Sequence, residues 1–140
     1  MSLLGLDFGE KKIGVARSDE LNFMAHTVGF IESRSESYVV GEIKKYIDEF
    51  RIQKIVIGLP KTLKGETGLQ AQKVMNFSNR LAGSISCPII PWDERLTTAE
   101  AERALIEQDM SRAKRKVKRD AIAAEIMLQS YLDFIKQRNE

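Results

Sequence analysis

The chain has 140 residues, 43% of them hydrophobic and 30% charged, and its 22 basic and 20 acidic residues leave a net charge of +2. This length and composition predict one globular domain over residues 1–140, and the lack of a secretory signal and of any apolar run near the ~20 residues of a membrane span predicts a cytoplasmic protein without membrane contact. One cysteine, Cys87, and one histidine, His26, exclude an intramolecular disulfide and a Cys/His zinc site, so any metal must have oxygen ligands.

The first elements expected are three strands. Apolar runs at 3–6 and 13–16 flank the polar turn 9–12 and predict a hairpin of two core strands, with Asp7 where the first strand ends. A third strand is expected over Thr27–Ile31. The chain therefore starts with a predicted β-meander.

A helix and a fourth strand follow. The helix carries apolar residues at helical spacing up to Phe50, and Ser35 or Ser37 is expected to cap it. The β-branched run Lys54–Leu59 is typical of a strand covered on both faces, which places it near the centre of the sheet.

The second half of the chain predicts further helices around one short strand. A helix is expected over 69–81 and a strand over Pro88–Pro91. Thr97 to Glu100 matches a capping box that starts a helix reaching about Glu107, and the last helix is expected over Arg119–Lys136.

This order of elements predicts an α/β fold, with helices on both faces of a sheet that begins as a meander. Functional groups in such sheets gather where strands end at their carboxyl termini. Asp7 and the pair Asp93 and Glu94 are expected at such ends.

Three acids are candidates for chemistry, although each has an ordinary structural explanation when judged singly. Asp7 suits a turn, Glu94 suits a helix N-terminus or an ion pair with Arg95, and Asp120 suits a first helical turn. Asp120 also shares a helix face with small alanines, which would let that end of the helix lie close to the sheet. Three acids brought together would repel one another unless hard cations such as Mg²⁺ or Mn²⁺ offset their charge.

A basic run precedes the last of these acids. Six of its eight residues are basic and none is acidic, namely Arg112, Lys114, Arg115, Lys116, Lys118 and Arg119. Such a run favours contact with phosphates. A solvated linker between two helices explains the same run equally well.

Four segments, LGLDFGEKKIGVARSD, VIGLPKTLKGETG, DERLTTAEAE and DAIAAEIMLQSYLD, occur in this order along the chain. Together they resemble the YqgF family, whose members are described as Holliday junction resolvases or pre-16S ribosomal RNA nucleases. The resemblance spans nearly the whole chain. It implies a ribonuclease H-like fold with a mixed five-stranded sheet, and it implies that Asp7, Glu94 and Asp120 converge as catalytic acids that hold two Mg²⁺ or Mn²⁺ ions.

The resemblance also implies contacts to nucleic acid. The loop Gly58–Gly65 is expected to border the site, with Lys61 and Lys64 as phosphate contacts or as solvated lysines. The full set of expected contacts is Lys12, Lys61, Lys64, Arg95 and the six residues of the basic run.

Two positions depart from the family pattern. Lys12 stands where arginine is expected, which keeps the charge and loses the bidentate fork. Residues 21–26 replace a stretch that contains proline in the family, and His26 within them is assigned no catalytic role.

The resemblance implies two substrates, the 5′ end of precursor 16S ribosomal RNA, which we favour, and four-way DNA. A resolvase cuts two strands symmetrically and calls for a homodimer, so a monomer would favour RNA processing. A different class of function is a non-catalytic nucleic-acid-binding assembly factor, although all three acids are present. An actin-like ATPase is set aside because 140 residues are too few for its two lobes.

Overall fold

A computed structural model describes residues 2–9, 11–60, 68–93 and 112–138, the side chains of 112–121 excepted. Five strands form one sheet in the order β3-β2-β1-β4-β5. The strands are β1 (Ser2–Phe8), β2 (Lys12–Ser18), β3 (Ala25–Glu32), β4 (Ile52–Leu59) and β5 (Ile89–Asp93), and the helices are α1 (Glu36–Phe50), α2 (Leu69–Ala82) and α4 (Arg112–Arg138).

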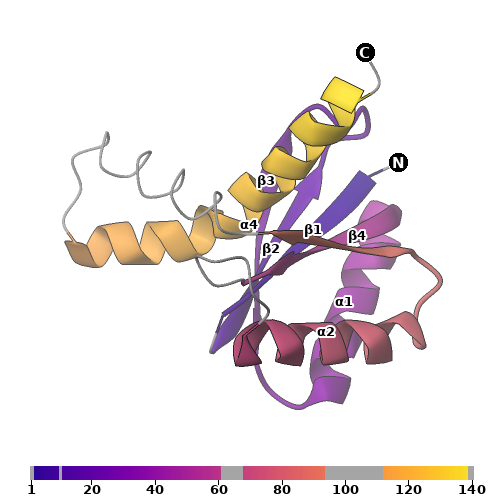
Figure 1. Cartoon of the computed structure of the whole chain (residues 1–140), viewed down its shortest axis with the longest axis vertical. Coiled ribbons are helices and arrows are strands. Elements are labelled where there is room, and N and C mark those ends of the chain that lie inside the picture. Colours follow the sequence, from indigo (N-terminus) through magenta and orange to yellow (C-terminus); the bar gives the residue numbers. More distant parts are fainter. Residues whose placement is uncertain (1, 10, 61–67, 94–111, 139–140) are drawn as a thin grey trace.

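The sheet is mixed. β1, β2 and β3 pair antiparallel as a meander, whereas β4 and β5 run parallel to β1. Helices α1 and α2 lie on one face and the C-terminal part of α4 crosses the other (Figure 1). The predicted mixed five-stranded sheet with helices on both faces is thereby confirmed.

Side chains that alternate along the strands build a separate core on each face. In β1, Leu4 and Leu6 pack under α1 and α2, while Leu3 packs under α4. Central strand β4 does the same, with Ile55 on the first face and Val56 on the second. A strand covered on both faces needs apolar residues at every position, which explains the continuous run in β4.

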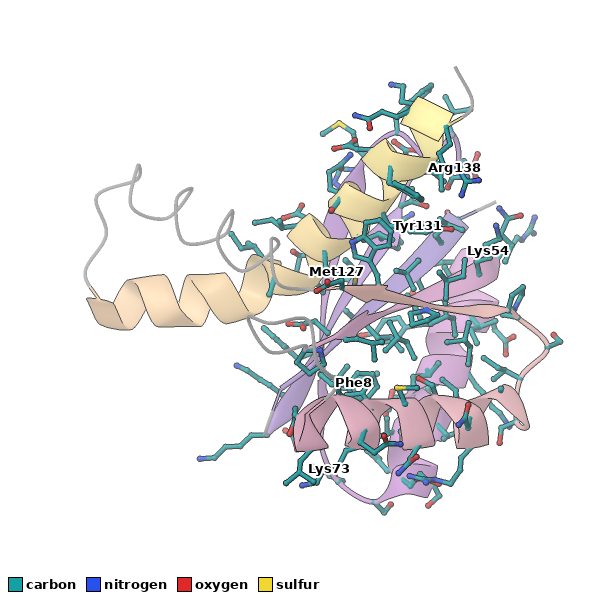
Figure 2. All side chains as sticks on the ribbon, in the orientation of Figure 1. Phe8, Lys54, Lys73, Met127, Tyr131 and Arg138 are labelled. Carbon is teal, nitrogen blue, oxygen red and sulfur yellow. The ribbon has the colours of Figure 1, made fainter. Side chains whose placement is uncertain are left out.

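Glycine lets α4 lie close to the sheet. A Cβ atom on Gly5 would lie 3.0 Å from the Cβ of Leu128 and 3.5 Å from the carbonyl oxygen of Ala124. Figure 2 shows Met127 and Tyr131 on the side of α4 that meets the sheet, and both are buried. The contact between α4 and β1 therefore depends on the missing side chain of Gly5.

Helix α1 shows how local sequence sets the ends of an element. The Ser35 hydroxyl accepts a hydrogen bond from the Tyr38 amide at 3.2 Å, so Ser35 rather than Ser37 is the N-cap. The helix ends at Arg51, whose φ of 52° lies in the left-handed region.

The last helix starts earlier than predicted. α4 begins at Arg112 and not at Arg119, so the basic run is helical and is not a linker, and Asp120 does not open the helix. Arginine, lysine and alanine are strong helix formers, and the run contains no glycine or proline to end the helix. The expected helix over Thr97–Glu107 lies outside the described residues. Among the helices described, none is long and apolar enough to cross a membrane.

Candidate active site

Asp7 lies near the carboxyl end of β1, on the face that α4 covers. Successive strand residues point to opposite faces, and Asp7 follows Leu3 and Gly5 at intervals of two. Its side chain is partly buried. The acid thus lies beside the apolar core under α4, at the end of the sheet where the parallel strands β1, β4 and β5 have their carboxyl ends.

The neighbours of Asp7 across the sheet are glycines. Gly14 pairs with Asp7 on one side, and the parallel register of β1 and β4, continued by one residue, places Gly58 on the other. Beyond the glycines, Phe30 pairs with Gly14 and Trp92 pairs with Gly58. The carboxylate therefore stands in a row with a bare backbone on either side and an aromatic residue at each end.

Helix α4 crosses the sheet antiparallel to β1, so its N-terminal side lies toward Asp7. The Gln129 side chain accepts a hydrogen bond from the Ala25 amide at 2.8 Å and donates one to the Phe23 carbonyl at 3.0 Å, while Glu125 lies near Thr27 further along β3. Residue numbers thus fall along α4 as they rise along β3, and β3 is parallel to β1.

This direction has a consequence for the second acid. Ala124 and Leu128 lie over Gly5, two residues before Asp7 in β1. One helical turn before Ala124 comes Asp120, on the same face of α4. The backbone of α4 therefore leads from Gly5 toward the end of β1 that carries Asp7, although the Asp120 side chain is not among those described.

Lys12 opens β2 on the face that Asp7 shares, because Lys12 and Gly14 are two residues apart. Its Nζ atom lies 4.2 Å from the centre of the Phe30 ring. The ring attracts the ammonium group and so keeps a positive charge on the sheet face that carries Asp7.

The other predicted site residues are not tested by the described coordinates. Glu94, Arg95, Lys61 and Lys64 lie outside the described residues, and the basic run is described as helix backbone alone. Within the described part of the chain, no group of three or more histidine, cysteine, aspartate or glutamate side chains could hold a metal ion.

Asp93 points away from the candidate site. It ends β5 and pairs with Leu59, which belongs to the core under α1 and α2. Trp92, one residue earlier, packs on the opposite core together with Tyr131. Asp93 is thus at a strand end, as expected, but on the face away from Asp7.

Two further titratable residues are excluded from the site by position. The Cys87 thiol donates to the Ile52 carbonyl at 3.3 Å, and burial raises the pKa of this thiol, which disfavours the nucleophilic thiolate. His26 is exposed on β3, opposite Arg17.

The turn between β2 and β3 closes without the proline of the family pattern. Asp19 accepts hydrogen bonds from the amides of Phe23 and Met24, at 3.0 and 3.2 Å. The bond from Phe23, followed by that from Met24, holds the pKa of the Asp19 carboxyl below its usual value. Asn22 adopts a φ of 60°, which asparagine tolerates.

Sequence reasoning gave no role to the glycines beside Asp7 or to Trp92. The signal that would have found them is the strand register, which joins residues far apart in the chain. Trp92 had a second signal, since it stands two residues before Glu94 in the segment WDERLTT.

Three comparisons with known proteins agree with this arrangement. The RuvX family model, described as "Holliday junction resolvase", matches residues 1–134. A Clostridium botulinum protein named "Putative pre-16S rRNA nuclease" is 44% identical over 137 residues, which cover 98% of this chain and 100% of the relative.

Two solved structures share the fold. The Holliday junction resolvase of fowlpox virus superposes with a TM-score of 0.59 at 14% identity, covering 96% of this chain and 99% of that one. RuvC of Thermus thermophilus in complex with a Holliday junction substrate gives 0.54 at 11% identity, covering 91% of each chain. At these identities the likeness shows the fold alone.

Proposed function

The chain belongs to the RuvX (YqgF) family of nucleases, and from this premise we propose that it is a metal-dependent endonuclease that processes the 5′ end of precursor 16S ribosomal RNA. The relative named above, 44% identical over its full length, carries the name of that activity. The proposed compartment is the cytoplasm.

The proposed metal ligands are Asp7, Glu94 and Asp120. Asp7 offers carboxylate oxygens, the donor type that Mg²⁺ and Mn²⁺ prefer, and its glycine neighbours leave its flanks bare. Glu94 is bonded to Asp93, the last residue of β5. Asp120 lies on α4 one turn before Ala124, and because α4 runs antiparallel to β1 this turn is on the side of the carboxyl end of β1.

The single observation that carries the proposal is the position of Asp7. A partly buried acid at a strand end, on the face that α4 crosses, is suited to binding a cation, and a second acid brought beside it would need compensating positive charge. Lys12 lies on the same face, with its ammonium group over the Phe30 ring. Two bound divalent ions would supply an activated water and stabilise the departing 3′ oxygen.

The chain's own residues would then bind and orient the substrate. Lys12 and the basic run in α4 would attract phosphates, and the carboxylates would fix the ions rather than move protons. Gly14 and Gly58 would let the scissile phosphate approach the backbone closely, because neither carries a Cβ atom.

The test is a cleavage assay on labelled precursor RNA with Mg²⁺, with Mn²⁺ and with a chelator. Asp7→Asn is expected to reduce cleavage to background while the thermal unfolding midpoint stays near that of the wild type. Asp48→Asn is the matched control, since Asp48 is an exposed acid on α1, across the sheet from Asp7. Undiminished cleavage by Asp7→Asn would rule the assignment out.

A second candidate, resolution of four-way DNA junctions, is favoured by the description of the family. The same assay with a labelled four-way junction separates the two. Paired symmetric cuts in the junction, made by a homodimer in solution, would favour resolution, whereas RNA cleavage by a monomer would favour processing.

A further inference from the structure

A hollow of about 550 Å³ lies beside the candidate active site, between the end of β5 and the C-terminal half of α4. Its apolar lining comes from Trp92, Ile126 and Phe134, and its polar lining includes Ser130, Asp133 and Gln137. This volume and mixture of rings with hydrogen-bonding groups suit a flat heterocycle.

The aromatic side chains of the hollow form a supported cluster. The Trp92 ring contacts Tyr131 edge to face, with ring centres 5.3 Å apart, and contacts Phe134 with centres 5.1 Å apart. Tyr131 is buried beneath them, whereas Phe134 is 40% exposed. The cluster therefore fixes Trp92 from below and keeps aromatic surface open to the outside.

Trp92 belongs both to the lining of the hollow and to the row that contains Asp7. Trp92 stands at the end of that row, two strands from Asp7, which is about 10 Å between their backbones. A stacked nucleic acid strand advances ~3.4 Å per nucleotide, so a few nucleotides span this distance. A strand with its phosphate at Asp7 would reach the hollow with a base about three nucleotides away.

The charges around the hollow suit a polyanion that carries a base. Arg138 lies 5.6 Å from the centre of the Phe134 ring, and the basic run occupies the other end of that helix. Lys136, in the same last turn, lies instead over the Phe23 ring. Asp133 within the lining can accept hydrogen bonds from the exocyclic amino groups of bases.

We infer that this hollow binds an unpaired nucleobase of the substrate, stacked on the exposed Phe134 ring with the Trp92 ring at its edge. The two rings are tilted by 53°, so one base lies flat on only one of them. The inference rests on the proposed nuclease function, which supplies the strand at Asp7. Stacking tolerates any base, since every base has a π-face, so the hollow selects for unpaired nucleotides rather than for a sequence. The substrate is then cut next to a single-stranded segment.

The test uses Trp92 as its own probe, because it is the single tryptophan of the chain. The Asp7→Asn variant, which is expected to bind without cutting, is titrated with a short single-stranded oligoribonucleotide and with the same sequence paired in a duplex. The single strand is expected to quench the fluorescence of Trp92 and the duplex is not. Equal quenching by the duplex would overturn the inference.

A second measurement uses the anisotropy of a labelled oligonucleotide. Phe134→Ala is expected to raise Kd roughly five- to 150-fold, the loss that corresponds to removing one stacked base. Met75→Ala on α2 is the matched control, because Met75 is 39% exposed and lies across the sheet. Wild-type affinity of Phe134→Ala would overturn the inference and leave the hollow to a protein partner.

The cleavage assay keeps the two proposals apart. Suppose that single strands quench Trp92 fluorescence but the wild-type protein cleaves no substrate with any metal. This result would contradict the nuclease proposal and support the stacking site. Cleavage by Phe134→Ala with an unchanged KM would sink the stacking site and leave the nuclease.

Discussion

The absence of a side chain at Gly5 lets α4 approach β1 closely. The Cβ atom that any other residue would carry lies 3.0 Å from Leu128, closer than well-packed side chains come. The same contact fixes the height of α4 above the strand that bears Asp7. One missing methyl group thus contributes both to the core and to the geometry of the site.

Gly5→Ala is therefore expected to destabilise the protein by about 1–3 kcal/mol, the usual cost of overpacking a core, and to lower cleavage by lifting α4. Urea unfolding measures the first effect and the cleavage assay the second. Gly41→Ala is the control, since a Cβ there meets no atom within 4 Å. Gly41 lies inside α1, so this variant is expected to gain about 0.5–1 kcal/mol. Equal stability of the two variants would contradict this account of Gly5.

The position of Asp7 in the chain was predictable and its surroundings were not. An acid that ends an apolar run, before a glycine turn, indicates a strand end. Its neighbours Gly14 and Gly58 depend on the pairing of three strands, and pairing register follows from the whole sheet rather than from local sequence. The proposed convergence with Glu94 and Asp120 came from the family resemblance, and the described coordinates leave it a prediction.

At the scale of elements, the capping of α1 resolves two sequence alternatives. Ser35 and Ser37 were both acceptable as caps, and the structure selects Ser35, whose hydroxyl accepts from the Tyr38 amide. Val39 and Ile43 are buried on the apolar face of the helix. A helix that begins directly after Ser35 includes both residues and turns this face toward the sheet.

Ser35→Ala is expected to lower the free energy of unfolding by about 1 kcal/mol, because the Tyr38 amide loses its acceptor. Ser37→Ala is expected to change it by a few tenths at most, since Ser37 lies within the first turn and is exposed. Thermal or urea unfolding of both variants decides the matter. A larger loss from Ser37→Ala would mean that the cap is assigned to the wrong serine.

The start of α4 was wrong in the sequence prediction for a physical reason. A solvated linker was one of two equal explanations of the basic run, and the last helix was expected to begin after it. Like charges repel along a helix, but the intrinsic helix preference of arginine, lysine and alanine outweighs that repulsion. The helix consequently extends from Arg112 through Arg119 into the part that packs on the sheet.

Over the whole molecule, net charge says little and the distribution of charge says more. The net charge is +2, yet six basic residues lie within two turns at the start of α4. In Figure 1 this end of α4, drawn in orange, projects beyond the sheet. A projecting basic helix is suited to long-range attraction of a phosphate backbone.

Replacing Arg115, Lys116 and Arg119 together by glutamine is expected to weaken nucleic acid binding and to flatten its salt dependence. The slope of log K against log salt should fall by about 2 for a single strand, if each residue contacts one phosphate. Glutamine preserves helix propensity, so circular dichroism should be unchanged.

The control for this triple variant replaces Lys44, Lys45 and Lys73 by glutamine. These lysines lie on α1 and α2, across the sheet from α4. It removes the same charge from the other face and is expected to leave the slope as it is. Equal slopes for the two triple variants would show that the run in α4 makes no phosphate contacts.

The reach of α4 limits what the protein can hold. From Arg112 to Phe134 the helix rises at most about 33 Å, at ~1.5 Å per residue. The distance between its ends is shorter, because its orange and yellow parts lie at an angle to each other (Figure 1). A strand that touched the basic end and filled the hollow at once would need at most about ten nucleotides, at ~3.4 Å each. Fragments of a few nucleotides can occupy one end only, so the bent helix would favour long precursors over the trimmed products of its own reaction.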